Sequence, residues 1–193
     1  MMRRLLVLSL VAGLAAPALA QTAPSERPAP QSLAELPMDG LFAGLAASPG
    51  DRAAKRFEAE IVRRFHRSGS DTADLLLSWA DRALKEKEYG PALDLLDRIV
   101  LLRPEFAEAW NKRATIHFLR KDFGKALADI ERTLRLEPRH FGALSGLAVI
   151  LREVGRTETA MSALRQALEI HPHLEDARDL LEKLEAGEAG RDI

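Results

Sequence analysis

The chain has 193 residues, of which 47% are hydrophobic and 30% are charged, and its formal net charge at pH 7 is −1. This composition supplies enough apolar side chains for one folded core, and the near-neutral charge argues against a surface dedicated to nucleic acid. The sequence contains no cysteine, which excludes disulfides and a lipid anchor on an N-terminal cysteine.

The first twenty residues have the pattern of a secretory signal peptide. Two arginines precede an apolar run over residues 5–16, and Ala18 and Ala20 provide the small-x-small cleavage pattern. The run is shorter than the roughly 20 apolar residues that a membrane-spanning helix needs. We therefore expect residues 1–20 to be cleaved from a bacterial protein that is released into the periplasm without a membrane span. An uncleaved anchor is the alternative.

A linker and two short helices are expected next. Residues 21–32 contain three prolines among polar residues, which is typical of an extended, polyproline-like linker. Residues 33–70 carry two helical patterns of large apolar residues, which we interpret as a degenerate helical unit that caps the N-terminal end of the domain. The alternative is that the aromatic residues of this unit form a face for a partner or for self-association: Phe42, Phe57 and Phe65.

A repeat of 34 residues occupies the chain from residue 71 to residue 174. Alanine recurs at this interval in two columns, and proline recurs in a third: Ala80, Ala114, Ala148; Ala92, Ala126, Ala160; Pro104, Pro138, Pro172. Large apolar residues between these columns follow the same period, as Leu96, Ile130 and Leu164 do. The period predicts three helix–turn–helix units, over residues 73–106, 107–140 and 141–174.

These columns resemble the signature of the tetratricopeptide repeat (TPR) family. The resemblance implies an all-α solenoid of stacked helix pairs, whose concave wall is made by the first helix of each pair and serves as a platform for binding other proteins. Residues 175–193 fit the capping helix and tail that such a solenoid needs, because three leucines lie on one face and acidic residues lie elsewhere: Leu180, Leu181, Leu184.

The concave wall is the predicted binding site for a protein or peptide segment. Helical spacing of the first helices assigns to it Leu77, Asp81, Glu108, Asn111, Thr115, Phe118, Ser145, Val149 and Arg152. Gly142 and Gly146 remove bulk at one end, and an asparagine amide can both donate to and accept from a peptide bond. Some family members clamp a C-terminal carboxylate with basic residues, but the corresponding positions here are mostly not basic. A solvated groove without a ligand is the alternative.

Four residues beside the wall suggest a basic rim for an acidic segment, with local salt bridges as the alternative: Lys112, Arg113, Arg139 and His140. We expect no enzyme activity, cofactor, metal or nucleic-acid partner, because catalytic and metal-binding motifs are missing from the sequence. The sequence therefore predicts a periplasmic protein–protein interaction module, an adaptor or assembly factor. A structural envelope protein that forms a homo-oligomer through its N-terminal aromatic residues is the alternative function.

Overall fold

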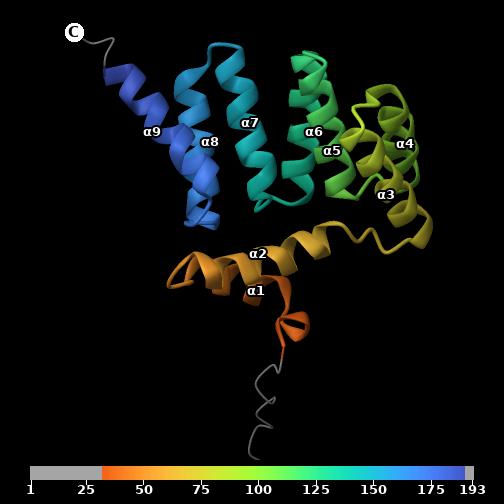
Figure 1. Cartoon of the computed structure of the whole chain (residues 1–193), viewed down its shortest axis with the longest axis horizontal. Coiled ribbons are helices and arrows are strands. Elements are labelled where there is room, and N and C mark those ends of the chain that lie inside the picture. The colour runs from red at the N-terminus through yellow and green to blue at the C-terminus, as the bar shows by residue number, and fades with distance from the viewer. Residues whose placement is uncertain (1–31, 190–193) are drawn as a thin grey trace, which may run out of the picture.

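The structure is a computed structural model that describes residues 32–189 (Figure 1). Every regular element in this range is helical: η1 (Leu33–Glu35), α1 (Met38–Ala46), α2 (Asp51–Phe65), α3 (Asp71–Lys85), α4 (Tyr89–Leu102), α5 (Ala107–Leu119), α6 (Phe123–Leu136), α7 (Phe141–Glu153), α8 (Thr157–Ile170) and α9 (Glu175–Ala189). The predicted signal peptide, nearly all of the predicted linker and the last four residues lie outside the described range. None of the described helices is both long enough and apolar enough to cross a membrane.

Three helical hairpins stack side by side in the order α3–α4, α5–α6 and α7–α8 (Figure 1). The repeated alanines lie where the helices approach one another, and each is at most 2% exposed: Ala80, Ala114, Ala148, Ala92, Ala126, Ala160. A methyl group fits at these contacts because helix axes packed at 8–10 Å leave little room for a longer side chain. The all-α solenoid predicted from the 34-residue period is confirmed.

The turns inside the three repeats share one backbone conformation. Lys87, Lys121 and Gly155 occupy the same column and have φ of 61°, 63° and 77°. The next residue donates its backbone N–H five residues back, as Glu88 does to the carbonyl of Ala83 at 2.8 Å. This is the Schellman ending, in which a left-handed residue closes the helix. The three repeated prolines come two residues after the ends of α4, α6 and α8, and so limit each second helix.

Helix α9 closes the C-terminal end of the stack. Its leucines pack with α8, and Ala177 is 2% exposed, while its acidic residues face outward: Glu175, Asp176, Asp179, Glu182, Glu185. A polar outer face of this kind keeps the open end of a solenoid in water.

The N-terminal hairpin α1–α2 is helical as expected, but its position differs from the prediction. It does not extend the stack as a cap before α3; it runs across the edge of the stack that carries the loops between repeats (Figure 1). Leu41, Phe42 and Leu45 of α1 belong to one buried cluster with Phe141 at the start of α7, and Ile170 and Leu174 pack against that cluster. The sequence shows that the helices are amphipathic, but it does not show which surface covers their apolar side.

This packing uses the aromatic residues that were considered for self-association. Phe42 is 6% exposed, and Phe57 and Phe65 pack against the same cluster. The ring of Phe57 lies directly on α1, because a Cβ atom at Gly44 would be 2.2 Å from the ring. The prediction of an aromatic self-association face on the hairpin is therefore wrong, since the repeats of the same chain cover that face.

Polar contacts fasten the hairpin at several points along the edge. His173 bonds Asp51 Oδ1 at 2.7 Å through Nδ1 and the carbonyl of Ser48 at 2.9 Å through Nε2. Arg139 donates to Asp39 at 2.7 Å and lies 4.2 Å above the ring of Phe42. The hairpin thus contacts the second and third repeats through residues about a hundred positions away in the chain.

Candidate functional site

A pocket of about 260 Å³ opens on the inner face of the stack, between α5 and α7. Its lining is mainly apolar: Asn111, Ala114, Thr115, Phe118, Ile130, Gly142, Gly146, Val149 and Ile150. The glycines of α7 create the opening, because a side chain at either position would project into it. Ile130 reaches the pocket from α6 and lies 3.6 Å from the position that a Cβ atom of Gly146 would take.

The structure brings four of the nine residues assigned to the concave wall into this pocket, together with the two glycines noted beside them: Asn111, Thr115, Phe118, Val149; Gly142, Gly146. Three further lining residues, Ala114, Ile130 and Ile150, escape the sequence reasoning. They are buried core positions of the repeat, so the sequence assigns them to packing alone. The signal that could have found them is the pair of glycines already noted at this end of the wall, because the bulk that they remove exposes part of that core to the groove.

Other wall residues lie elsewhere. Leu77 is 2% exposed and belongs to the core between α3 and α4, so its assignment to the groove is wrong. Ser145 is half-buried and donates its hydroxyl to the carbonyl of Phe141 at 3.0 Å. Arg152 is exposed near the end of α7 and bonds Glu153 at 2.7 Å, outside the lining of the pocket.

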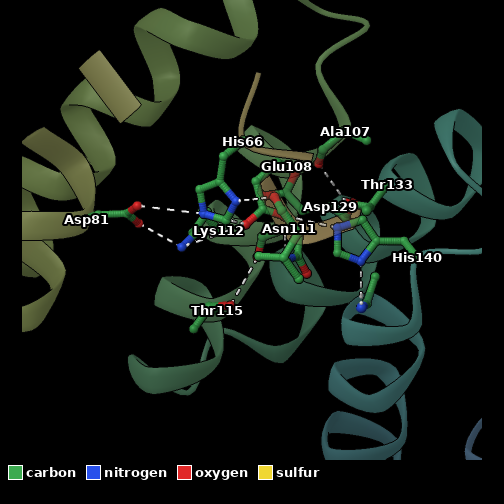
Figure 2. Close-up of polar contacts among 12 residues, drawn as sticks. His66, Asp81, Ala107, Glu108, Asn111, Lys112, Thr115, Asp129, Thr133 and His140 are labelled. Carbon is green, nitrogen blue, oxygen red and sulfur yellow. Dashed lines mark hydrogen bonds and ion pairs between the residues drawn. The ribbon is translucent and has the colours of Figure 1, made fainter. Parts of the chain in front are cut away.

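Asp81 and Glu108 belong to a polar cluster beside the pocket (Figure 2). The Lys112 ammonium lies 2.7 Å from Asp81 and 3.6 Å from Glu108. His66, at the end of α2, lies 3.6 Å from Glu108 and 3.9 Å from Asp81. Glu108 is 5% exposed, so it is a buried anchor of this cluster and is not available to a ligand, contrary to its assignment to the groove.

Glu108 also orients two neighbours. Its Oε2 atom lies 2.9 Å from His140 Nε2 and accepts from Asn111 Nδ2 at 3.1 Å. His140 Nδ1 accepts the backbone N–H of Ala143 at 3.0 Å, so Nε2 carries the proton that points to Glu108. Burial raises the pKa of the Glu108 carboxyl, but the hydrogen bond from His140 and the nearby Lys112 ammonium outweigh burial and hold this pKa below its ordinary value.

The contacts of Glu108 fix the orientation of the Asn111 amide at the pocket. Only the NH₂ group of an amide can donate to a carboxylate, so Nδ2 faces Glu108 and Oδ1 is directed away from it. The phenyl ring of Phe65 stacks on the His140 ring at 4.4 Å between centroids, which closes the other side of the cluster with a residue of α2. One wall of the pocket therefore rests on contacts made by the N-terminal hairpin.

The predicted basic rim is not present as a set of free charges. Arg113 makes two hydrogen bonds to Asp129, at 2.8 and 2.7 Å, and a third to Asp97 at 2.8 Å. Its guanidinium also lies 4.6 Å from the centre of the Trp110 ring. The two carboxylates come from the neighbouring helices α4 and α6. Arg113 thus replaces an apolar packing residue by joining three helices through ion pairs.

The other rim residues are paired in the same way. Lys112 and His140 contact Asp81 and Glu108, and Arg139 bonds Asp39 and Glu137, the latter at 3.3 Å. The alternative of local salt bridges is therefore correct, and the prediction of a rim for an acidic segment is wrong. Within residues 32–189, histidine and acidic side chains form no group of three or more suited to a metal ion. The arrangement is suited to holding an apolar side chain and one peptide hydrogen bond.

Comparisons with known proteins agree with this fold. Two family models, both described as Tetratricopeptide repeat, match residues 77–131 and 115–185. Among solved structures, the first TPR of Spaghetti (RPAP3) bound to an HSP90 peptide has a TM-score of 0.60 at 22% identity, covering 62% of this chain and 95% of that one. The Sgt2 TPR domain from Aspergillus fumigatus has a TM-score of 0.59 at 23% identity, covering 63% and 83%.

Sequence relatives include a TPR repeat-containing protein of Rhizobium etli, which is 40% identical over 153 residues, covering 79% of this chain and 75% of the relative. Anaphase-promoting complex subunit 3 of Schizosaccharomyces pombe is 26% identical over 88 residues, which is 46% of this chain and 13% of that protein. This match covers most of both proteins and agrees with the 34-residue period and the stacked hairpins. The chain belongs to the tetratricopeptide repeat family.

Proposed function

We propose that this chain is a periplasmic protein–protein interaction module, an adaptor or assembly factor that holds a segment of another protein on the inner face of its repeats. The observation that carries the proposal is the open pocket of about 260 Å³ between α5 and α7. Its apolar floor is exposed by Gly142 and Gly146, where a longer side chain on either would fill the opening. An apolar pocket with few placed polar groups is the usual form of a binding site.

The chemistry of the pocket defines the segment that it accepts. Ile130, Ile150 and Phe118 favour one large apolar side chain, and Asn111 Oδ1 is placed to accept a backbone N–H beside it. The cationic groups nearest to the pocket are already paired with carboxylates, so a free C-terminal carboxylate gains little there. We therefore assign an internal segment of a partner as the ligand, with an apolar anchor residue.

Two structural relatives support this type of binding. The first TPR of Spaghetti (RPAP3) has been solved with an HSP90 peptide, and the TPR2B domain of yeast Sti1 has been solved in a complex with pHsp70. Those peptides belong to those proteins; the common feature is the fold that presents a groove. Periplasmic location rests on the signal-peptide pattern of residues 1–20.

A peptide selection tests the binding function. A phage-displayed library of random 12-residue peptides is selected on the full chain, and enriched peptides are measured by calorimetry. We expect dissociation constants on the order of micromolar, near 8 kcal/mol, and at least tenfold weaker binding to Gly146→Leu, whose side chain fills the pocket. Gly124→Leu is the matched control, because Gly124 is also helical but has open space around it. If Gly146→Leu binds the selected peptides as tightly as Gly124→Leu does, the peptides bind outside this pocket.

Export is tested separately. Residues 1–31 are fused to alkaline phosphatase, which folds to an active enzyme only after export to an oxidising compartment. We expect activity from the wild-type segment in a Gram-negative host and a loss of it with Leu8→Arg, which interrupts the apolar run. Activity that does not depend on Leu8 would contradict the assignment of a signal peptide.

A further inference from the structure

One stripe of α3 is exposed throughout, although two of its positions are buried in both following repeats. It consists of Asp71, Leu75, Ser78, Trp79, Arg82 and Glu86, which share one side of the helix and are all exposed. Leu75 is 50% exposed, whereas its counterparts one and two repeats later, Ala109 and Ala143, are fully buried at 0%. Trp79 is 46% exposed.

The difference follows from the position of the N-terminal hairpin. Helix α4 packs on α5, and α6 packs on α7, so each of these first helices is covered by the second helix of the preceding repeat. Helix α3 has no such neighbour within the described part of the chain, because α1–α2 lies along the loop edge. No element within residues 32–189 therefore covers the N-terminal end of the stack, which is called the open end below.

This open end does not have the composition of a polar cap. Helix α9 closes the other end with an acidic outer face, whereas α3 presents a tryptophan and a leucine side by side. A further pocket of about 330 Å³ lies next to Trp79, between α3 and α4, with Pro91 and Leu95 in its lining. Exposed aromatic residues beside a pocket are typical of protein interfaces.

The charges of the stripe identify the partner. Arg82 stands where the next two repeats have Ile116 and Ile150, which are 0% and 2% exposed, so one more repeat helix stacked there would bury an unpaired guanidinium. Within the stripe, the acidic Asp71 lies in the first turn of α3 and the basic Arg82 lies in the last turn, while the acidic Glu86 follows at the C-cap, beyond the helix. Such a helix is complementary in charge to an antiparallel copy of itself.

We infer that a second copy of this chain binds here, so that the protein forms a two-fold dimer through antiparallel α3 helices. A two-fold axis between Leu75 and Trp79 packs Leu75 of each copy against Trp79 of the other copy. The same register places Arg82 of each copy beside Asp71 of the other copy. The inner pocket between α5 and α7 lies on a different face, so the dimer is independent of the proposed peptide binding and presents two grooves.

Sedimentation equilibrium of the full chain tests the dimer. A single helix pair buries less than the roughly 1,200 Å² of a standard interface, so we expect a dissociation constant on the order of tens of micromolar. Trp79→Glu should leave only monomer at 200 µM protein, roughly ten times that constant. Leu119→Glu is the matched control, because Leu119 is 45% exposed on another surface, and it should remain dimeric. A monomeric wild type, or a dimer that Trp79→Glu leaves unchanged, overturns the inference.

Two further variants test the geometry. The chain has no cysteine, so Ser78→Cys introduces a single thiol near the proposed axis, and mild oxidation should link two copies through it. Ser162→Cys, exposed on α8, should give no such linked dimer. Arg82→Asp should weaken dimerisation at least tenfold by opposing Asp71, and adding Asp71→Arg should restore it. Equal cross-linking at both cysteines, or no rescue by the charge exchange, contradicts the antiparallel register.

Discussion

Two glycines inside helices should respond in opposite ways to the same substitution by alanine. At Gly146 the added methyl group meets only Ile130 Cδ1 at 3.6 Å, an ordinary van der Waals contact. Replacing glycine in a helix interior then raises stability by about 0.5–1 kcal/mol, because the unfolded chain loses backbone freedom. At Gly44 the methyl group would lie 2.2 Å from Phe57 Cε1. The ring must leave its position, and overpacking of this kind lowers stability by about 1–3 kcal/mol.

Urea and thermal unfolding monitored by circular dichroism measure both effects. For a chain of this size, 1 kcal/mol corresponds to a shift of roughly 2–4 °C in the unfolding midpoint. Gly44→Ala combined with Phe57→Leu should lose less stability than the sum of the two single variants, because the shorter side chain removes the overlap. A destabilised Gly146→Ala, or a Gly44→Ala with unchanged stability, would refute the packing described for these two sites.

The Gly146 substitution also separates function from stability. The methyl group narrows the inner pocket, so Gly146→Ala should bind a selected peptide more weakly than the wild type while unfolding at a higher temperature. A glycine that lowers stability and opens a pocket is understandable only if the opening has a use. Stability and binding that change in the same direction would argue that Gly146 serves packing alone.

Two more predictions concern ion pairs. Asp129 is 4% exposed, and Arg113→Ala removes its bidentate partner, so this variant should lower the free energy of unfolding by about 3 kcal/mol. Arg113→Lys keeps the charge and should lower the free energy of unfolding by less. Chemical denaturation measures both losses, and equal losses would exclude the bidentate geometry. Hydrogen bonds to the Ser48 carbonyl and to Asp51 raise the pKa of His173 above its ordinary value, so the protonated form favours folding. This stabilisation is complete below about pH 6.5 and is lost as the pH rises through the folded-state pKa. The unfolding midpoint of the wild type should therefore fall relative to His173→Gln between pH 6 and 8.5, and parallel profiles would contradict the contact.

The sequence predicts the repeats well because each residue that recurs at the 34-residue interval has a local structural cause. Alanine marks the close approach of two helices, and proline marks the end of the second helix, so the positions recur wherever the geometry recurs. The structure shows both columns in their expected places, as at Ala114, Ala148 and Pro138. Helix-forming patterns between these positions then determine the fold class without any knowledge of distant contacts.

The errors concern contacts between segments that are far apart in the chain. Arg139 and Asp39 are 100 positions apart, and nothing near either residue announces the pair. Arg113 finds its carboxylates 16 positions away on both sides, on helices whose relative rotation the sequence does not specify. Leu77 shows the limit of helical phase: it shares a repeat column with Asn111, which lines the pocket, yet it is 2% exposed, because a column has the same phase in every repeat but not the same neighbours.

The position of the hairpin α1–α2 has a mechanical consequence for the proposed binding site. Repeats in a solenoid contact only their neighbours, so the curvature of a short stack is easily changed. Here one hairpin contacts the third repeat through Phe141 and Leu174 and reaches the side of the first repeat through His66, which lies near Asp81 (Figure 1). Bending the stack would have to break these contacts together.

We therefore expect the pocket between α5 and α7 to keep its width in the absence of a ligand. A preformed pocket loses less conformational entropy on binding than one that must be ordered by its ligand. The cluster around Glu108 connects the hairpin to this pocket directly, since it joins His66 of the hairpin to Asn111 at the pocket wall (Figure 2). A hairpin that caps the first repeat would close the open end of α3 but would brace nothing. In its observed position it leaves that end exposed and contacts the cluster beside the proposed groove.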